Sequence, residues 1–231
     1  MIQFSNFEKK IKVFFKDKNL LKQSFTHRSY INENGAANIS HNERLEFLGD
    51  AVLELIVTDF LYKKYPHYPE GKLTALRSAL VNAVIISEIA SKIGMNDYLL
   101  LSKGEAKDFG KARQYILANT FEAFIGAMYL DQGYGVVDKF ITKTLLPKTE
   151  EIVNKKLWRD AKSLVQEKAQ EFVLVTPLYK VLHESGPDHD KHFTVGIYFG
   201  KDLIAEGKGG SKQEAEQNSA LAALKIKNWL D

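Results

Sequence analysis

Apolar side chains recur at helical spacing through the first 146 residues. The pattern predicts an all-α domain with helices over residues 1–15, 18–30, 42–65, 71–80, 84–93, 113–130 and 136–146. Polar loops are expected at residues 32–39 and 103–111, and Pro66 and Pro147 follow helix ends. Residues 147–160 mix charges with few apolar positions, which favours a connector between two domains.

The period of the pattern changes after residue 160. A helical pattern over residues 161–172 is followed by alternating patterns at 178–183, 192–199 and 203–207, and then by a helical pattern over 211–229. This order predicts a small α+β domain of α-β-β-β-α topology over residues 161–231. The chain is therefore expected to hold two domains, 1–146 and 161–231.

The composition is ordinary for a globular protein, with 45% hydrophobic and 26% charged residues in 231. The richest apolar run, residues 51–61, is interrupted by Glu54 and Asp59, so no membrane segment is expected. The first fifteen residues interleave Lys and Glu with apolar positions, unlike a secretory signal, and we expect a cytoplasmic protein. The chain has no Cys, which excludes disulfides and thiolate chemistry.

An acidic stripe stands out within the helix predicted at residues 42–65. Glu43, Glu46 and Asp50 lie at offsets of three and seven, which places three carboxylates on one face. Because like charges repel at this spacing, a divalent cation is expected against the stripe. Ser40 and Glu43 also fit a capping box, but this alternative leaves Glu46 and Asp50 unexplained.

A matching face occurs on the helix predicted at residues 113–130. Asn119 and Glu122 lie three apart, and Gly126 follows one turn later. Gly49, beside Asp50, is costly inside a helix and suggests that another helix approaches closely there. If the two faces meet, their oxygen ligands would suit Mg²⁺ or Mn²⁺. The absence of Cys, and of a His at the di-iron spacing, favours magnesium over iron.

Four segments together resemble the ribonuclease III family of double-stranded RNA endonucleases. They are NERLEFLGD at residues 42–50, SFTHRSY at 24–30, ANTFEAFIG at 118–126, and Glu70-Gly71 followed by LRSALV at 76–81. The resemblance extends over nearly the whole chain. It implies the helical endonuclease fold of that family for the first domain, followed by a double-stranded RNA-binding domain.

The resemblance also implies a chemistry and a set of residues. The family hydrolyses double-stranded RNA with Mg²⁺, for which Mn²⁺ can substitute, and leaves 5′-phosphate and 3′-hydroxyl ends with short 3′ overhangs. By matching position, the metal ligands are Glu46, Asn119 and Glu122, the catalytic acids are Asp50 and Glu122, and the supporting acids are Glu43 and Glu70. Processing of ribosomal RNA precursors, messenger RNA and transfer RNA is the implied role.

Asn119 departs from the family, which usually has Asp at this position. An amide oxygen can coordinate a cation, but it brings no negative charge and should bind Mg²⁺ more weakly. We expect an active enzyme that needs more metal. Two alternatives remain open at this point: a non-catalytic or weakly catalytic RNA-binding protein, and a helical carboxylate protein that handles metal without RNA.

The C-terminal domain resembles the double-stranded RNA-binding domain, which recognises A-form geometry and phosphates rather than base sequence. The matching RNA contacts lie on the first helix, in the GPDH loop at 186–189 and at the start of the last helix. They are Ser163, Gln166, Glu167, His189, Lys208 and Lys212. Residues 159–231 have ten Lys and Arg against eleven Asp and Glu, so modest, salt-sensitive RNA binding is expected.

Cleavage of both strands of a duplex requires two sites, and one acid cluster per chain supplies one. The resemblance therefore implies a symmetric homodimer in which two clusters face opposite strands. Phe47 and Leu48, on the exposed side of the acidic helix, are the interface candidates.

Overall fold

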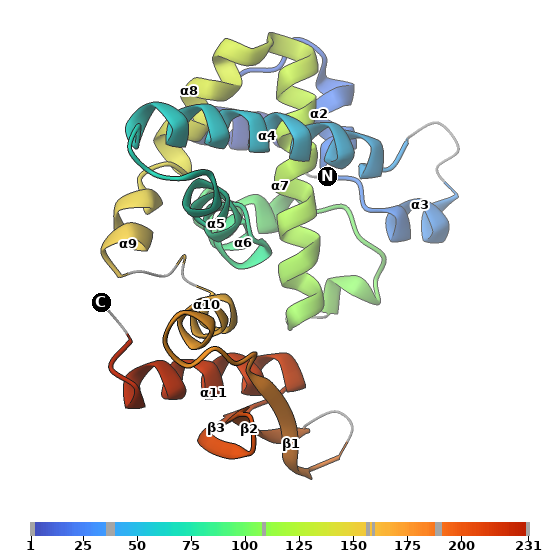
Figure 1. Ribbon diagram of the computed structural model, residues 1–231. Helices are drawn as coiled ribbons and strands as arrows, with labels where there is room; N and C mark the ends of the chain where they lie inside the picture. Colours follow the sequence, from blue (N-terminus) through green and yellow to red (C-terminus); the bar gives the residue numbers. More distant parts are fainter. Residues whose placement is uncertain are drawn as a thin grey trace. The chain divides into compact units, whose positions relative to one another are not determined.

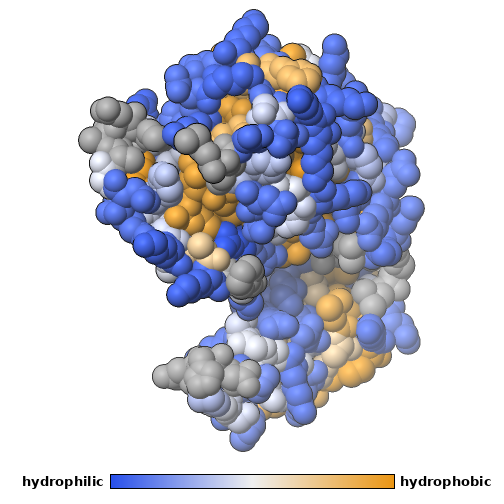
Figure 2. Space-filling view, turned by 180° about the vertical axis from the view of Figure 1, so that it is seen from behind, coloured by the Kyte–Doolittle hydropathy of each residue, from blue (hydrophilic) through white to orange (hydrophobic). Residues whose placement is uncertain are grey.

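The computed structural model describes residues 3–35, 40–107, 110–155, 158, 160–187 and 191–229 (Figure 1). The chain forms two compact units, Met1–Trp158 and Arg159–Asp231, each with its own core. The surface seen in Figure 2 is mostly hydrophilic, with smaller areas where apolar side chains gather.

The first unit is helical, as the apolar spacing predicts. Its described α-helices are α1 (Phe4–Ile11), α2 (Lys18–Ser24), α3 (Arg28–Asn34), α4 (Glu43–Lys64), α5 (Glu70–Leu80), α6 (Ala83–Lys92), α7 (Lys111–Gln132), α8 (Tyr134–Thr144) and α9 (Lys148–Asn154). Short 3₁₀ turns span Met95–Tyr98 and Glu105–Lys107.

The core of this unit forms around α7. Figure 1 shows α7 running across α4, with α5, α6 and α8 nearby. Twelve residues of α7 are buried, among them Phe121 and Phe124. Phe7 and Phe25 pack on Phe124 with ring centroids 5.5 and 6.1 Å away. A helix buried on most sides cannot shift without opening this core, so α7 is a rigid support for the residues that it carries.

The helix predicted over residues 18–30 is two helices in the structure. Thr26 leaves the helix to form a short parallel bridge with Leu100, and the His27 ring then caps α3 by accepting a hydrogen bond from the Ser29 N–H. The capping box proposed for Ser40 and Glu43 is also wrong. Asn42 is the N-cap of α4, and its buried side chain donates instead to the Ser24 carbonyl, at 3.2 Å.

The segment predicted as a connector contains α9, whose Thr149 and Ile152 are buried in the first unit. These two residues lie three apart on one face, toward α5. Val153 is partly buried against the same core, and the other residues of α9 are polar. The short apolar face gave too weak a pattern to predict a packed helix.

The second unit has the predicted α-β-β-β-α order. It consists of α10 (Ala161–Val173), β1 (Leu178–Ser185), β2 (His192–Phe199), β3 (Asp202–Gly209) and α11 (Lys212–Ile226). The strands form an antiparallel sheet in the order β1-β2-β3. One face of β2 packs on the helices through Val195, Ile197 and Phe199. The predicted fold class, an all-α domain followed by a small α+β domain, is confirmed.

No single helix in the described ranges is long and apolar enough to cross a membrane. Taken together, the bent pair of α5 and α6 has the length and composition of a membrane-crossing segment. Leu76, Leu80, Ile86 and Ile89 of this pair are buried in the core of the first unit.

Candidate active site and RNA-binding surface

Two glycines allow α4 and α7 to cross with their backbones in contact. A Cβ on Gly49 would overlap the carbonyl oxygen of Glu122, and a Cβ on Gly126 would overlap that of Leu45. Any side chain at either position would force the helices apart. The prediction that Gly49 marks a close helix approach is therefore confirmed, and Gly126 is its counterpart on α7.

The crossing brings together acids that are 72 residues apart in the sequence. Burial, together with the nearby charges of Asp50 and Glu46, raises the pKa of Glu122 to about 8. Burial likewise raises the pKa of Glu46, with contributions from Glu43 and Asp50. The carboxylates of Glu46, Asp50 and Glu122 thus form one repelling group, which we call the acid cluster.

Glu43 lies at the edge of this cluster and has basic neighbours. The Arg28 guanidinium lies 3.6 Å from one carboxylate oxygen and the His41 ring nitrogen Nδ1 lies 3.8 Å from the other. Both partners are well exposed, so these contacts add little stability and leave Arg28 accessible to solvent.

Sequence reasoning gave Arg28 no role, although it lies in a quoted motif. Its position depends on the bridge between Thr26 and Leu100, which sets α3 beside the start of α4. The His27 N–H donates to the Leu100 carbonyl at 3.0 Å, and the Ser29 hydroxyl accepts from the Ser102 N–H at 3.1 Å. A pattern of apolar residues gives no signal for such loop contacts.

Asn119 and Glu70 occupy different places relative to the cluster. Asn119 is half-buried on α7, one turn before Glu122, so the two share a helix face. Glu70 begins α5 and accepts a hydrogen bond from the Thr74 hydroxyl, at 3.0 Å. Glu70 and Thr58 both line a cavity of about 460 Å³. Thr58 follows Asp50 by eight residues on α4, which corresponds to about 12 Å along the helix axis. Within one chain, Glu70 therefore lies away from the acid cluster.

Among the described residues, no three Asp, Glu or His side chains lie in an arrangement that could hold a metal ion. The donor set nevertheless fits a hard divalent cation. The acids offer only oxygen ligands. Their burial and mutual repulsion raise the pKa of Glu122. A cation at the crossing would relieve that repulsion, whereas no Lys or Arg is among the groups that perturb Glu122.

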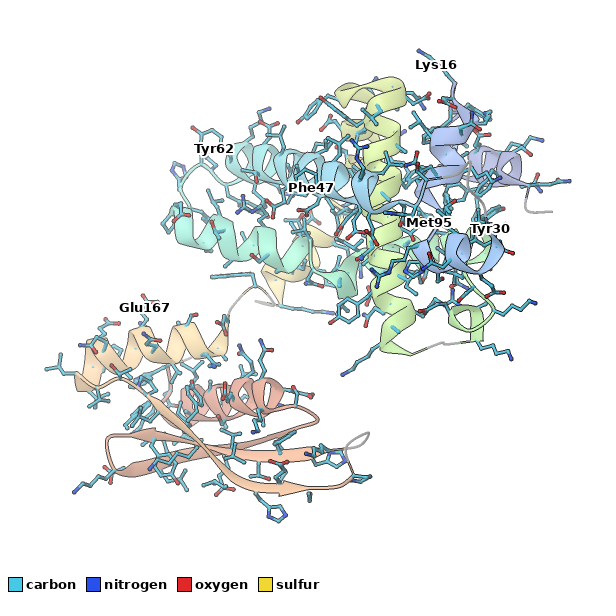
Figure 3. The ribbon with its side chains drawn as sticks, turned by 90° about the vertical axis from the view of Figure 1, so that its right-hand side faces the viewer. Lys16, Tyr30, Phe47, Tyr62, Met95 and Glu167 are labelled. Atoms are coloured by element: carbon cyan, nitrogen blue, oxygen red, sulfur yellow. The ribbon has the colours of Figure 1, made fainter. Side chains whose placement is uncertain are left out.

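The residues predicted on the first RNA-binding helix share one face of α10. Gln166 and Glu167 are exposed, three and four residues after Ser163 (Glu167 is labelled in Figure 3). The Ser163 hydroxyl donates to Asp160 at 2.7 Å, and Asp160 also accepts from Gln217 of α11. These contacts hold the start of α10 against α11 and fix the exposed face.

The start of α11 carries the other predicted contacts, and His189 lies outside the described residues. Lys208 and Lys212 are exposed on either side of the Gly-rich turn. The N-cap is Ser211, whose hydroxyl accepts from the Glu214 N–H at 3.2 Å, while the Glu214 carboxylate accepts from the Gly210 N–H at 2.9 Å. This arrangement is similar to a capping box, although the Glu214 carboxylate accepts from the residue before the N-cap, and it places a negative charge where RNA contacts were predicted.

Replacement of Glu214 with Gln is expected to strengthen binding of the full-length protein to duplex RNA by about threefold, because a charge that repels phosphate is removed. The Gln side-chain oxygen can still accept from Gly210, so α11 should keep its cap. The measurement is a gel-shift titration without divalent metal. Glu206→Gln is the matched control, because Glu206 is exposed on β3 between the buried Ala205 and Gly207 and so faces away from α11. Unchanged or weaker binding by Glu214→Gln would contradict the role assigned to this helix start.

The fold and the acid cluster together define the class of protein, a nuclease-type helical domain joined to a duplex-RNA-binding domain. The family described as Ribonuclease-III-like matches residues 17–149, and the double-stranded RNA binding motif matches residues 161–227. The chain belongs to the ribonuclease III family, and it is an endoribonuclease that acts on double-stranded RNA.

Named relatives are similar over most of their length. Ribonuclease 3 of Enterococcus faecalis is 45% identical over 213 residues, 92% of each chain. Ribonuclease 3 of Protochlamydia amoebophila is 46% identical over 94% of this chain and 89% of its own. A solved nuclease domain of ribonuclease III from Campylobacter jejuni, described with a region involved in dimer formation, has a TM-score of 0.57. It is 37% identical and covers 62% of this chain and 96% of its own.

Proposed function

We propose that the protein is a Mg²⁺-dependent hydrolase of duplex RNA in which Glu46, Glu122 and Asn119 hold the metal and Asp50 acts at the attacking water. The observation that supports this proposal is the backbone contact of α4 and α7 at Gly49 and Gly126, which brings Glu122 close enough to Glu46 and Asp50 for their charges to raise its pKa. Mn²⁺ has similar ligand preferences and should substitute for Mg²⁺.

The proposed reaction is one in-line displacement. Water attacks phosphorus, the bond to the 3′ oxygen breaks, and the fragments carry a 5′-phosphate and a 3′-hydroxyl. A bound divalent metal would supply charge stabilisation and lower the pKa of water. Asp50 is the exposed acid of the cluster, so it can orient the attacking water from the solvent side. Glu122 is anchored on the rigid α7, which fixes the position of the site.

Basic groups beside the cluster can position the substrate. Arg28, close to Glu43 and open to solvent, can contact an RNA phosphate next to the cleaved one. Glu43 would then set the orientation of Arg28 rather than bind the metal. Glu70, at the far end of α4, supports the architecture of α5 through Thr74, and its replacement should have a small effect on the chemistry of the same chain.

A substitution at Asn119 tests directly whether this residue is a metal ligand. Asn119→Asp adds a charged ligand one turn from Glu122 and is expected to lower the Mg²⁺ concentration for half-maximal cleavage about threefold to tenfold. The measurement is cleavage of end-labelled duplex RNA against Mg²⁺, with sequencing-gel analysis of the ends. If the Mg²⁺ concentration for half-maximal cleavage does not change, Asn119 is not a metal ligand. A native protein that retards duplex RNA but never cuts it with Mg²⁺ would overturn the proposed function.

We infer that two chains act as a symmetric homodimer. Phe47, labelled in Figure 3, is 83% exposed on α4. It lines a groove of about 680 Å³ together with Leu20, Leu48 and the half-exposed Leu130. An exposed aromatic beside an apolar groove can pack reciprocally against the same surface on a second copy, as a two-fold interface requires. Two acid clusters then serve opposite strands, which leaves short 3′ overhangs.

Phe47→Ala is expected to convert the dimer to monomer at micromolar concentration, because a buried aromatic anchor contributes about 2 kcal/mol or more to an interface. Light scattering after size exclusion measures the change, and double-strand cleavage should fall with it. Tyr62→Ala is the matched control, since Tyr62 is also exposed on α4 but does not line this groove. A native protein that is monomeric at these concentrations would refute the dimer.

Ribosomal RNA precursors, with other structured messenger and transfer RNA transcripts, are the proposed substrates, and the cytoplasm is the proposed location. We propose that residues 1–146, extended by the packed helix α9, form the catalytic and dimerisation domain, and that residues 161–231 form the RNA-binding domain. The direct assay for the proposed substrates is the release of shorter RNA products from long duplex precursors in vitro.

A further inference from the structure

A groove separate from the acid cluster crosses α1, α6, α8 and the start of α9. One part, about 360 Å³, lies between α1, α6 and α8, and an adjoining part, about 380 Å³, extends to Pro147. The two parts share Ile89, Lys92, Lys143 and Thr144, so the groove is continuous. Its lining includes no residue of α4 or α7, the helices that carry the acid cluster.

The floor of this groove is apolar. Ile89 and Phe140 belong to the buried core, and Ile11 and Ile93 pack against that core while remaining partly exposed. A floor of this kind offers contacts to aliphatic side chains and none of the hydrogen-bond donors that a polar ligand needs at its base.

The rim of the groove is basic. Lys10, Lys92 and Lys143 line it, and none of the three forms an ion pair with any residue that the structure describes. Gly94, with φ of +85°, leaves room for the Lys10 ammonium group above it. Three unpaired ammonium groups around an apolar floor favour a ligand that is both acidic and apolar.

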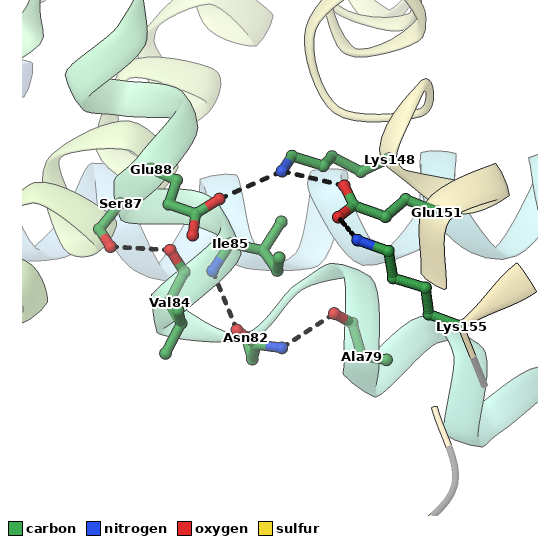
Figure 4. A network of polar contacts seen from close by, with 9 residues as sticks. All are labelled: Ala79, Asn82, Val84, Ile85, Ser87, Glu88, Lys148, Glu151 and Lys155. Atoms are coloured by element: carbon green, nitrogen blue, oxygen red, sulfur yellow. Dashed lines mark hydrogen bonds and ion pairs between the residues drawn. The ribbon is translucent and has the colours of Figure 1, made fainter. Parts of the chain in front are cut away.

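The end of the groove at α9 is already neutralised. Lys148 lies 3.2 Å from Glu88 and 3.3 Å from Glu151, and Glu151 also contacts Lys155 at 2.9 Å (Figure 4). Glu88, which lines the groove, therefore already forms an ion pair with Lys148. The unbalanced positive charge is confined to the part bounded by Lys10, Lys92 and Lys143.

We propose that this groove binds an acidic amphipathic segment of a partner protein. Its carboxylates would pair with Lys10, Lys92 and Lys143, and its apolar side chains would cover the isoleucine floor. RNA fits less well, because a phosphate backbone presents nothing apolar and would leave the floor exposed. The residues that line the groove also include no exposed aromatic ring for a base to stack on.

The test uses full-length protein and a short fluorescein-labelled peptide with Leu on one helical face and Glu on the other. Fluorescence anisotropy should show saturable binding, and Lys92→Glu/Lys143→Glu should weaken it about tenfold. The charge-matched control is Lys9→Glu/Lys12→Glu, which changes exposed lysines outside the groove. Cleavage of duplex RNA should be the same for both double variants, because neither touches the acid cluster.

Ile93→Ser tests the apolar floor. It should weaken the binding of the peptide severalfold without changing how that binding depends on salt. A scrambled peptide of equal composition should bind far more weakly. The proposal is overturned if the scrambled peptide binds equally, if no peptide binds, or if the lysine reversals reduce duplex RNA affinity as much as peptide affinity. The last outcome would assign the groove to RNA.

Discussion

Glu122→Gln is expected to lower the rate of duplex RNA cleavage by about a thousandfold or more, while RNA binding persists. Gln has nearly the shape of Glu, so the contact between α4 and α7 should remain, but the charge of a proposed metal ligand is lost. Single-turnover cleavage and gel retardation of the same duplex measure the two properties. Glu150→Gln, an exposed acid on α9, makes the same chemical change far from the crossing and should cleave normally.

The same variant should change how stability depends on pH. The pKa of Glu122 rises from 4.5 to about 8 on folding, so the folded state keeps a proton that the unfolded chain releases between these values. The free energy of unfolding therefore falls as pH rises through this window. In metal-free buffer at pH 9, Glu122→Gln should be on the order of 1 kcal/mol more stable than the native protein.

Thermal melts in chelator from pH 5 to pH 9 measure this effect. Added Mg²⁺ should raise the melting temperature of the native protein more than that of Glu122→Gln, because binding to the folded state alone is stabilising. Equal rates of cleavage by the two proteins, or an equal response to Mg²⁺, would mean that Glu122 does not serve the metal.

Gly49→Ala is expected to destabilise the first unit by about 3 kcal/mol and to reduce cleavage at least a hundredfold at temperatures where the protein stays folded. The added methyl group would overlap the Glu122 carbonyl of α7, and the overlapping atom is backbone, which cannot rotate away. The two helices must then separate, and the acids that they carry separate with them.

Chemical denaturation and cleavage assays on the same preparation measure both effects. Gly71→Ala and Gly135→Ala are the controls, because a Cβ at either position meets nothing within 4 Å and both lie in helices. They should stabilise the protein by about 0.5 kcal/mol. Native-like stability of Gly49→Ala would show that the helices do not need this contact.

Much of the fold could be predicted from local patterns. The long helices α4 and α7 have strong apolar spacing, and the strands of the second unit alternate clearly, so their type and order were predictable. The break between α2 and α3 was not, because it depends on Thr26 pairing with Leu100, far along the chain. The burial of α9 was missed because its two apolar residues, Ile152 and Val153, are too few to give a helical pattern.

The sequence by itself determined which chemical groups are available: oxygen ligands at helical spacing, two glycines at matching positions and a duplex-RNA-binding domain after them. Spacing along one helix is fixed by covalent geometry, so Glu46 and Asp50 share a face wherever the helix lies. Only the tertiary structure decided that Glu122 joins them, that Arg28 reaches Glu43, and that Glu70 does not reach the cluster within its own chain. Those relations depend on how separate helices pack, and packing is set by contacts between residues distant in the sequence.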